Sequence, residues 1–267
     1  MGDITLRKAL DDYKTVYMPY RNFAERTRIE YQNDLVDLIG FIERSGMHFV
    51  NSLGLSIIER YVAYLEQKGF ASLTRKRKVV AIRSFLSFLY QDGYIHTDIG
   101  KRVVLPFTES PSPYVLTQKE CDRLRNACAD SPRDSAIIEL ILQTGIKLSE
   151  LVHLTQDDIE FDGTAKDHGF MRVLGSRGKK ERMIPLNNKA CVALQNYFSV
   201  RTDTGNGVLF LNRFGESLGE SGVQKMLRKG LHRAGIGSAS IQTLRHTFGV
   251  HHIAKGTNSK TVQEIIA

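Results

Sequence analysis

Apolar residues recur at helical spacing through the first hundred residues of the chain. Three short groups of this kind come first. A longer one follows from Leu73 to Gln91, with Val79, Ile82 and Leu89 on its apolar side. Strand-like alternation does not interrupt the pattern, which therefore predicts a small all-helical bundle. The three short groups are Leu6, Leu10, Tyr13 and Tyr17; Tyr31, Leu35, Leu38 and Ile42; and Ile57, Ile58, Tyr61 and Leu65.

The pattern changes in the second half, where helical and β-type segments alternate. Thr117 and Glu120 have the spacing of a capping box and predict the start of a helix. Two short β-type runs, 169–174 and 182–186, flank a polar turn with glycines and predict a β-hairpin. The expected fold class is therefore mainly α with a small β-hairpin or sheet. Further helices are expected at 134–143, 188–200, 220–234 and 243–255, with Gly256 as a left-handed C-terminal residue and a last helix from Asn258.

The segment from Val103 to Pro113 separates these two halves. It holds three of the six prolines and lacks helical periodicity, which is typical of a linker. A chain of 267 residues has room for two domains. We expect a helical domain at residues 1–107 and a mixed domain at residues 108–267.

Several classes of protein are disfavoured by the sequence. No apolar run approaches the ~20 residues that span a bilayer, and the N-terminus has no basic region followed by an apolar stretch. We therefore expect a cytoplasmic protein with no membrane partner. Cys121 and Cys128 lie on one predicted helix, ~10.5 Å apart along its axis, which is too far for a disulfide. No Cys-x-x-Cys pair indicates a metal site, so the cysteines are interpreted as buried apolar side chains.

The net charge of +8 suits a polyanionic partner such as nucleic acid, although charge alone does not establish one. One basic cluster lies at the start of the helix from Leu73, where no acid occurs between Glu66 and Asp92. A second lies in the predicted hairpin. We expect both to contact DNA, while a solvated helix face and a solvated hairpin tip are the alternatives. The residues are Thr74, Arg75, Lys76, Arg77, Lys78 and Arg83, and Arg177, Lys179, Lys180 and Arg182.

Four local patterns follow the linker in order. Residues 144–151 read Thr-Gly-Ile-Lys-Leu-Ser-Glu-Leu, and the hairpin at 175–185 is rich in glycine and lysine. Residues 242–248 read Gln-Thr-Leu-Arg-His-Thr-Phe, and a fourth pattern runs from Gly256 to Ile265. Each alone is weak, but together they resemble the catalytic domain of tyrosine recombinases of the phage-integrase family. Residues 1–107 resemble the SAM-like core-binding domain of the same family.

The resemblance implies a mechanism. In the family the two domains clamp double-stranded DNA at a specific recombination site, and a tyrosine attacks the scissile phosphate to form a 3′-phosphotyrosine. Four protomers exchange strands as a homo-tetramer, without a metal or other cofactor. By this resemblance Arg245 holds the phosphate, Lys180 is the hairpin lysine that supplies a proton, and Glu150 orients the first cation. The implied catalytic residues are Lys147, Glu150, Lys180, Gln242, Arg245 and His246.

Three departures from the family pattern bear on activity. Lys147 replaces the family's first arginine, which keeps the charge but loses the bidentate guanidinium fork. Gln242 replaces a histidine and cannot transfer a proton at neutral pH. The family's tyrosine lies beyond the 22 residues (267 − 245) that follow Arg245, and none of these is a tyrosine. We therefore expect the chain, interpreted as C-terminally truncated, to bind DNA without cutting it and to be a monomer in solution.

Two other functions stay open. An integrase-derived DNA-binding factor without catalysis would also account for Lys147 and Gln242. A metal-dependent nuclease would have to use the acidic cluster Asp157, Asp158 and Glu160, which helix capping or a solvated loop explains better.

Overall fold

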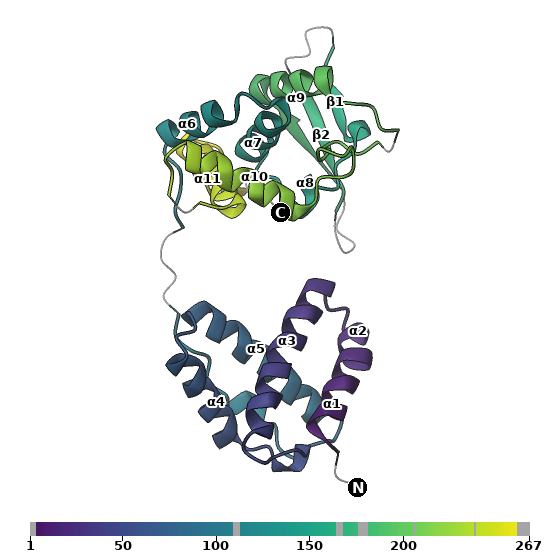
Figure 1. Cartoon of the computed structure of the whole chain (residues 1–267), viewed down its shortest axis with the longest axis vertical. Coiled ribbons are helices and arrows are strands. Elements are labelled where there is room, and N and C mark those ends of the chain that lie inside the picture. The colour runs from purple at the N-terminus through teal and green to yellow at the C-terminus, as the bar shows by residue number, and fades with distance from the viewer. Residues whose placement is uncertain are drawn as a thin grey trace. The chain divides into compact units, whose positions relative to one another are not determined.

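The structure, a computed structural model, describes residues 4–108, 113–163, 168–175, 181–205, 207–237 and 239–260. It divides into two compact units, Met1–Pro111 and Ser112–Ala267, each with its own hydrophobic core (Figure 1). The prediction of a mainly helical fold with a small sheet is confirmed. Within the described ranges, no helix is long and apolar enough to cross a membrane.

The first unit is helical, as its apolar spacing predicts. The long helices α3 and α5 pack against each other and against the shorter helices, and their buried faces carry residues such as Leu35, Leu38, Ile82 and Phe85. The predicted apolar groups are therefore the core. The helices are α1 (Leu6–Asp12), α2 (Met18–Tyr20), α3 (Glu25–Glu43), α4 (Leu55–Gln67) and α5 (Ser72–Gln91), with short 3₁₀ turns at Val50–Ser52 and Ile99–Arg102.

A π-helical segment, Tyr13–Tyr17, joins α1 to α2. Its signature is the Met18 backbone N–H, which donates to the Tyr13 carbonyl five residues earlier. The rings of Tyr13 and Tyr17 stack at 5.3 Å between centroids, and both contact Phe88 of α5. The buried Tyr13 hydroxyl donates to Ser84 at 2.7 Å. The wider turn thus places two tyrosines of one helix against the same face of α5.

The second unit surrounds a central helix, α7, which is buried at every position from Ala136 to Leu142. Glu139, the one charged residue in this stretch, pairs with Arg125 of α6 at 2.5 Å. The capping box of Thr117 and Glu120 is confirmed at the start of α6. The helices are α6 (Gln118–Cys128), α7 (Pro132–Thr144), α8 (Leu148–Leu151), α9 (Asn188–Val200), α10 (Glu220–Arg233) and α11 (Ile241–Ala254).

The sheet has one more strand than the predicted hairpin. β2 (Gly169–Val173) and β3 (Arg182–Leu186) pair antiparallel, as the alternation predicts, and β1 (Ile159–Phe161) adds to the other edge of β2. β1 has only three residues, too few for alternation to mark it. Gly169 is required at this edge because a Cβ there would lie 2.3 Å from the carbonyl oxygen of Glu160.

Two further predictions concern single residues. Cys121 and Cys128 are buried, as expected, and Cys191 is buried as well. Gly256, which follows the C-cap Lys255 of α11, has φ +87, which confirms it as the left-handed residue after the helix. The helix expected from Asn258 falls largely on residues 261–267, which lie outside the described residues.

Candidate active site

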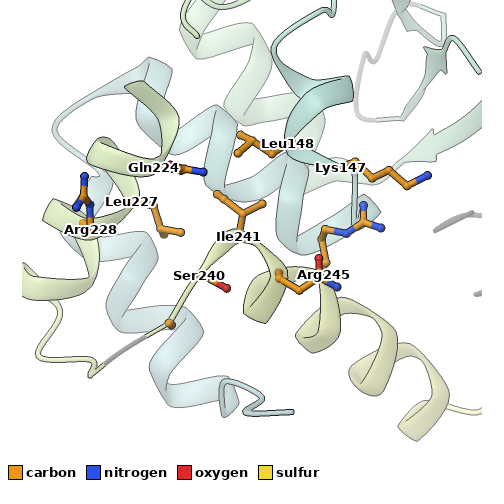
Figure 2. Close-up of a pocket in the computed structure, with 10 residues that line it drawn as sticks. Lys147, Leu148, Gln224, Leu227, Arg228, Ser240, Ile241 and Arg245 are labelled. Carbon is orange, nitrogen blue, oxygen red and sulfur yellow. The ribbon is translucent and has the colours of Figure 1, made fainter. Parts of the chain in front are cut away.

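A cavity of about 740 Å³ opens between α8, α10 and α11 of the second unit (Figure 2). Its walls are apolar where Leu148, Leu227 and Ile241 line it, and cationic where Lys147 and Arg245 line it. These two cations belong to the first and third sequence patterns. Gln242 lines the cavity too, so the fold brings three of the predicted catalytic residues to one cavity.

The side chain of Arg245 is held by a hydrogen bond to the C-terminal end of α7. Only 7% of the residue is exposed, and its guanidinium donates to the backbone carbonyl of Gly145. Gly145 adopts φ +61, and a Cβ there would lie 2.7 Å from the Phe248 ring on α11. A glycine is therefore needed both for the backbone conformation and for the close approach of α11. Burial lowers the pKa of Arg245 from its ordinary value, while nearby Glu150 raises it; an arginine remains charged throughout.

Glu150 joins the first pattern to the sheet. Its buried carboxylate accepts two hydrogen bonds from the Arg182 guanidinium, at 3.0 and 2.8 Å, and one from the Lys147 backbone N–H at 3.0 Å. Burial alone would raise the pKa of Glu150, but these bonds and the charges of Arg182 and Lys147 bring the pKa below its usual value. The carboxylate is therefore ionised at neutral pH.

The Lys147 ammonium lies farther from this carboxylate than Arg182 does. Its Nζ is 3.5 Å from the Glu150 Oε1, and about a third of the side chain is exposed. The Lys147 backbone N–H also donates to this carboxylate, but the carboxylate's bidentate partner is Arg182. That Glu150 orients the Lys147 side chain stays a prediction. Arg182, predicted as a DNA contact of the hairpin, thus takes part in the structure of the site.

The two remaining predicted residues of α11 contact each other. Gln242 Nε2 lies 2.9 Å from His246 Nε2, one helical turn away. Gln242 is exposed and lines the cavity, whereas His246 is half-buried. Three predicted cations of the hairpin, Arg177, Lys179 and Lys180, lie outside the described residues.

Three of the five cations in the basic cluster of α5, Arg75, Arg77 and Lys78, pair with acids, which corrects the expectation that the cluster has no acids to pair with. The partners come from neighbouring helices instead of from the same segment. Arg75 binds Glu66 of α4 at 2.7 Å, and Arg77 binds Glu30 at 3.1 Å and also Asp34, both of α3. A sequence gap in acids therefore says little about pairing across a bundle.

Lys78 departs furthest from its predicted role as a DNA contact. It is 4% exposed, and its Nζ lies 3.0 Å from Asp34 and 2.7 Å from Asp37. In this conformation it is an internal ion pair between α3 and α5, with no exposed ammonium to offer a phosphate. Lys76, Arg83 and Thr74 are half-buried, and the Lys76 ammonium donates to Thr108 at 3.3 Å.

Asp158 of the acidic cluster after the first pattern is a structural residue that caps a short helical turn, as the capping interpretation predicts. Asp158 accepts from the backbone N–H and hydroxyl of Thr155 at 2.9 and 2.7 Å, and it pairs with Arg172 at 3.1 Å. Among the described residues, no group of three His, Cys, Asp or Glu side chains is arranged to hold a metal ion.

With this geometry, similarity to known proteins becomes informative. Residues 114–267 match the phage integrase family, and residues 10–93 match the phage integrase N-terminal SAM-like domain. The chain belongs to the phage integrase family. Tyrosine recombinase XerC of Roseiflexus sp. (strain RS-1) is 31% identical over 258 residues, covering 92% of this chain and 80% of the relative. Tyrosine recombinase XerD of Bifidobacterium longum (strain NCC 2705) is 30% identical over 268 residues, covering 92% and 84%.

Solved structures share the fold of this integrase-family chain. The lambda integrase dimer bound to a COC′ core site superimposes with a TM-score of 0.79 at 17% identity, over 99% of this chain and 95% of that chain. The Tn1549 transposon integrase in complex with circular intermediate DNA gives a TM-score of 0.74 at 20% identity, over 98% and 91%. At these sequence identities the likeness establishes the fold of the chain and does not assign roles to its residues.

Sequence reasoning missed the contribution of α10 to this integrase-family site. Gln224 and Arg228, one turn apart, line the same cavity as Lys147 and Arg245. The exposed face of α10 is polar and basic, and the spacing of its basic residues was a signal available in the sequence. That face carries Gln224, Lys225, Arg228, Lys229, His232 and Arg233.

Proposed function

We propose that this chain is a site-specific tyrosine recombinase of DNA, and that Arg245 and Lys147 hold the phosphate at which strands are cut and rejoined. The observation that carries the proposal is the buried Arg245, anchored on Gly145 and facing the same cavity as Lys147. A phosphodiester gains negative charge on its non-bridging oxygens under attack, so preorganised cations lower the barrier. The relatives, tyrosine recombinases XerC and XerD, support the same reaction class.

We further propose that residues 1–107 and 108–267 both contact double-stranded DNA at a specific recombination site. The partly exposed cations of α5 and the basic face of α10 support this, because each supplies several donors to phosphates. On the DNA the proposed assembly is a homo-tetramer, like the lambda integrase tetramer bound to a Holliday junction, and in solution it is a monomer. Acting on DNA, the protein would work in the cytoplasm and need no metal or other cofactor.

Residues 1–267 are proposed to bind DNA without forming a covalent link to it. The second unit contains two tyrosines, Tyr114 and Tyr197. The Tyr197 hydroxyl accepts from the buried Leu211 backbone N–H, and the Tyr114 hydroxyl donates to Glu120. Neither lines the cavity of Arg245. In the proposed reaction Lys180 supplies the leaving-group proton, with Gln242 and His246 as supporting polar groups.

The chemistry of the cationic site can be tested without a protein nucleophile. A duplex selected for binding from a random library is nicked, with a 3′-p-nitrophenyl phosphate facing a 5′-hydroxyl. Attack by the 5′-oxygen forms the phosphodiester and expels p-nitrophenolate, which is read by absorbance and strand joining. We expect the 267-residue protein to accelerate joining, Arg245→Ala to abolish the acceleration, and Lys147→Arg to raise it by roughly 10²-fold.

A DNA-binding factor without catalysis is the second candidate, favoured by Lys147 and Gln242. It predicts the same specific binding to the selected duplex but no acceleration of joining by the parent protein or by Lys147→Arg. Joining at the uncatalysed rate in all variants, together with intact binding, would therefore replace the recombinase proposal with this one.

A further inference from the structure

The Glu150 carboxylate has two cationic neighbours of unequal closeness. Arg182, at the start of β3, donates to both oxygens at 3.0 and 2.8 Å, whereas the Lys147 ammonium lies 3.5 Å away. Parallel guanidinium–carboxylate bonds are the strongest and most directional ion pairs that side chains form. Arg182 is also the more buried cation, with 18% of its side chain exposed against 34% for Lys147. The carboxylate is therefore held mainly by Arg182.

We propose that Arg182 is a positioning residue that occupies Glu150 and thereby keeps the Lys147 ammonium turned toward the phosphate. The inference rests on the proposed function of Lys147 as a phosphate ligand. Lysine carries a compact ammonium on a flexible stem, so its direction is set by competing anions more than an arginine fork would be. A buried carboxylate one turn away on α8 is the strongest such competitor described in the site.

Removal of Arg182 would change which cation the carboxylate holds. The Glu150 side chain is 8% exposed, and a buried carboxylate without its partner carries a large free-energy penalty. Lys147, already in a 3.5 Å ion pair with Glu150, can relieve that penalty by moving its Nζ under an ångström closer, to hydrogen-bonding distance. The ammonium would then bind protein carboxylate in place of DNA phosphate. Figure 2 shows Lys147 and Arg245 lining the cavity from which this movement would withdraw one cation.

The mechanism predicts that a second mutation repairs the first. Arg182→Ala should slow joining of the p-nitrophenyl phosphate duplex by about tenfold, less than the ~10²-fold expected for Lys147→Ala. In the double variant Arg182→Ala/Glu150→Gln, the neutral amide no longer attracts Lys147, so joining should be several-fold faster than in Arg182→Ala alone. Arg182→Lys, which keeps a cation near Glu150, should be intermediate.

The position of Lys147 is measured independently of the reaction. Its rate of acetylation by a water-soluble acyl ester, followed by peptide mass spectrometry, reports how tightly the amine is held. We expect acetylation of Lys147 to fall several-fold in Arg182→Ala and to recover in the double variant. Arg172→Ala is the matched control. Arg172 lies on the neighbouring strand β2, and its replacement also removes an arginine from an ion pair with a carboxylate, that of Asp158. It should change neither rate.

The outcomes separate this inference from the proposed function. If Lys147→Ala and Arg245→Ala leave both joining and DNA binding unchanged, the phosphate site itself is wrong. If those variants are impaired but Glu150→Gln fails to repair Arg182→Ala, and Lys147 acetylation is unaltered, Arg182 has no positioning role. If circular dichroism shows that the Arg182→Ala protein is unfolded, Arg182→Lys takes its place in the test. Parental rates of both joining and Lys147 acetylation in Arg182→Lys would then overturn the inference.

Discussion

The guanidinium of Arg245 donates to the backbone carbonyl of Gly145, one hundred residues earlier in the chain. The contact joins α11 to the turn that ends α7, and that turn leads directly to Lys147 at the start of α8. Two patterns that are separate in the sequence are thus one structural unit. A change at Gly145 should accordingly reach both cations of the site.

Gly145→Ala should destabilise the second unit by about 3 kcal/mol or more. Part of the loss comes from the left-handed backbone at φ +61, and part from the Cβ that would meet Phe248 at 2.7 Å. Hydrogen–deuterium exchange followed by mass spectrometry measures the free energy of opening in each unit separately.

Gly235→Ala is a matched control for Gly145→Ala. Gly235 has the same φ of +61, but a Cβ there would meet only the Arg123 guanidinium, at 3.8 Å. It should cost about 1 kcal/mol, the backbone contribution alone. Equal losses for the two variants would show that the contact with Phe248 does not constrain position 145.

Lys78→Met should destabilise the first unit by ~3–5 kcal/mol, because it leaves Asp34 buried with one fewer partner. DNA affinity per folded molecule, and its dependence on salt concentration, should stay near the parent values. Fluorescence anisotropy across a salt series measures the affinity, and calorimetry measures the stability.

Lys76→Met is the corresponding test of a half-buried neighbour. It should leave stability within about 0.5 kcal/mol of the parent and lower the salt dependence of binding by roughly one phosphate contact. If Lys78→Met lowered the salt dependence of DNA binding and Lys76→Met did not, the internal role of Lys78 would be contradicted.

The stability of the second unit should depend on pH through Glu150. The folded-state pKa of Glu150 lies below its ordinary value of 4.5, so its stabilising contribution is present above pH 4.5. That contribution is lost as pH falls through the lowered folded value. Glu150→Gln should therefore flatten the acid side of the stability curve, measured by thermal unfolding between pH 3 and 6.

Asp130→Asn, at an exposed position, is the control for the pH dependence. It should reproduce the parent curve, since the Asp130 side chain is exposed to solvent. A Glu150→Gln curve with the same acid slope as the parent would mean that the Arg182 and Lys147 bonds do not hold the carboxylate ionised.

Arg228→Ala should weaken binding of the selected duplex about three- to tenfold and reduce the salt slope by about one. Arg228 lines the cavity with Lys147 and Arg245, so its loss removes one cation facing the DNA. Arg213→Ala, at an exposed arginine outside that cavity, should leave both quantities unchanged. Identical effects of the two substitutions would exclude a specific role for α10.

Much of the fold was predictable because its signals are local. The apolar spacing of residues such as Leu35, Leu38 and Ile82 marks the helices, and alternation marks β2 and β3. β1 was not predictable, since three residues carry no period and its pairing with β2 is set by tertiary contacts. The short helix α8 was missed for the same reason, with one turn of Leu148–Leu151 after Lys147.

The sequence predicted which residues form the site, but not which of their side chains pair with each other. Order and spacing of the sequence patterns nominate Lys147, Glu150 and Arg245, and the fold brings these residues together. The pairing of Glu150 with Arg182 depends on how β3 passes α8, which the sequence does not state. Likewise, the acids that pair with α5 come from α3 and α4, so their absence from the segment itself was misleading.

The π-helical segment Tyr13–Tyr17 is equivalent to one residue inserted into an otherwise regular helix. Deleting a single residue there would rewind it into α-helical register and rotate everything N-terminal to it by about 100°. The apolar stripe of α1, with Leu6 and Ala9 buried, would then turn away from α3. The one extra residue of the π-helical segment therefore fixes the rotation of α1 about its axis, and so which of its faces packs against the bundle.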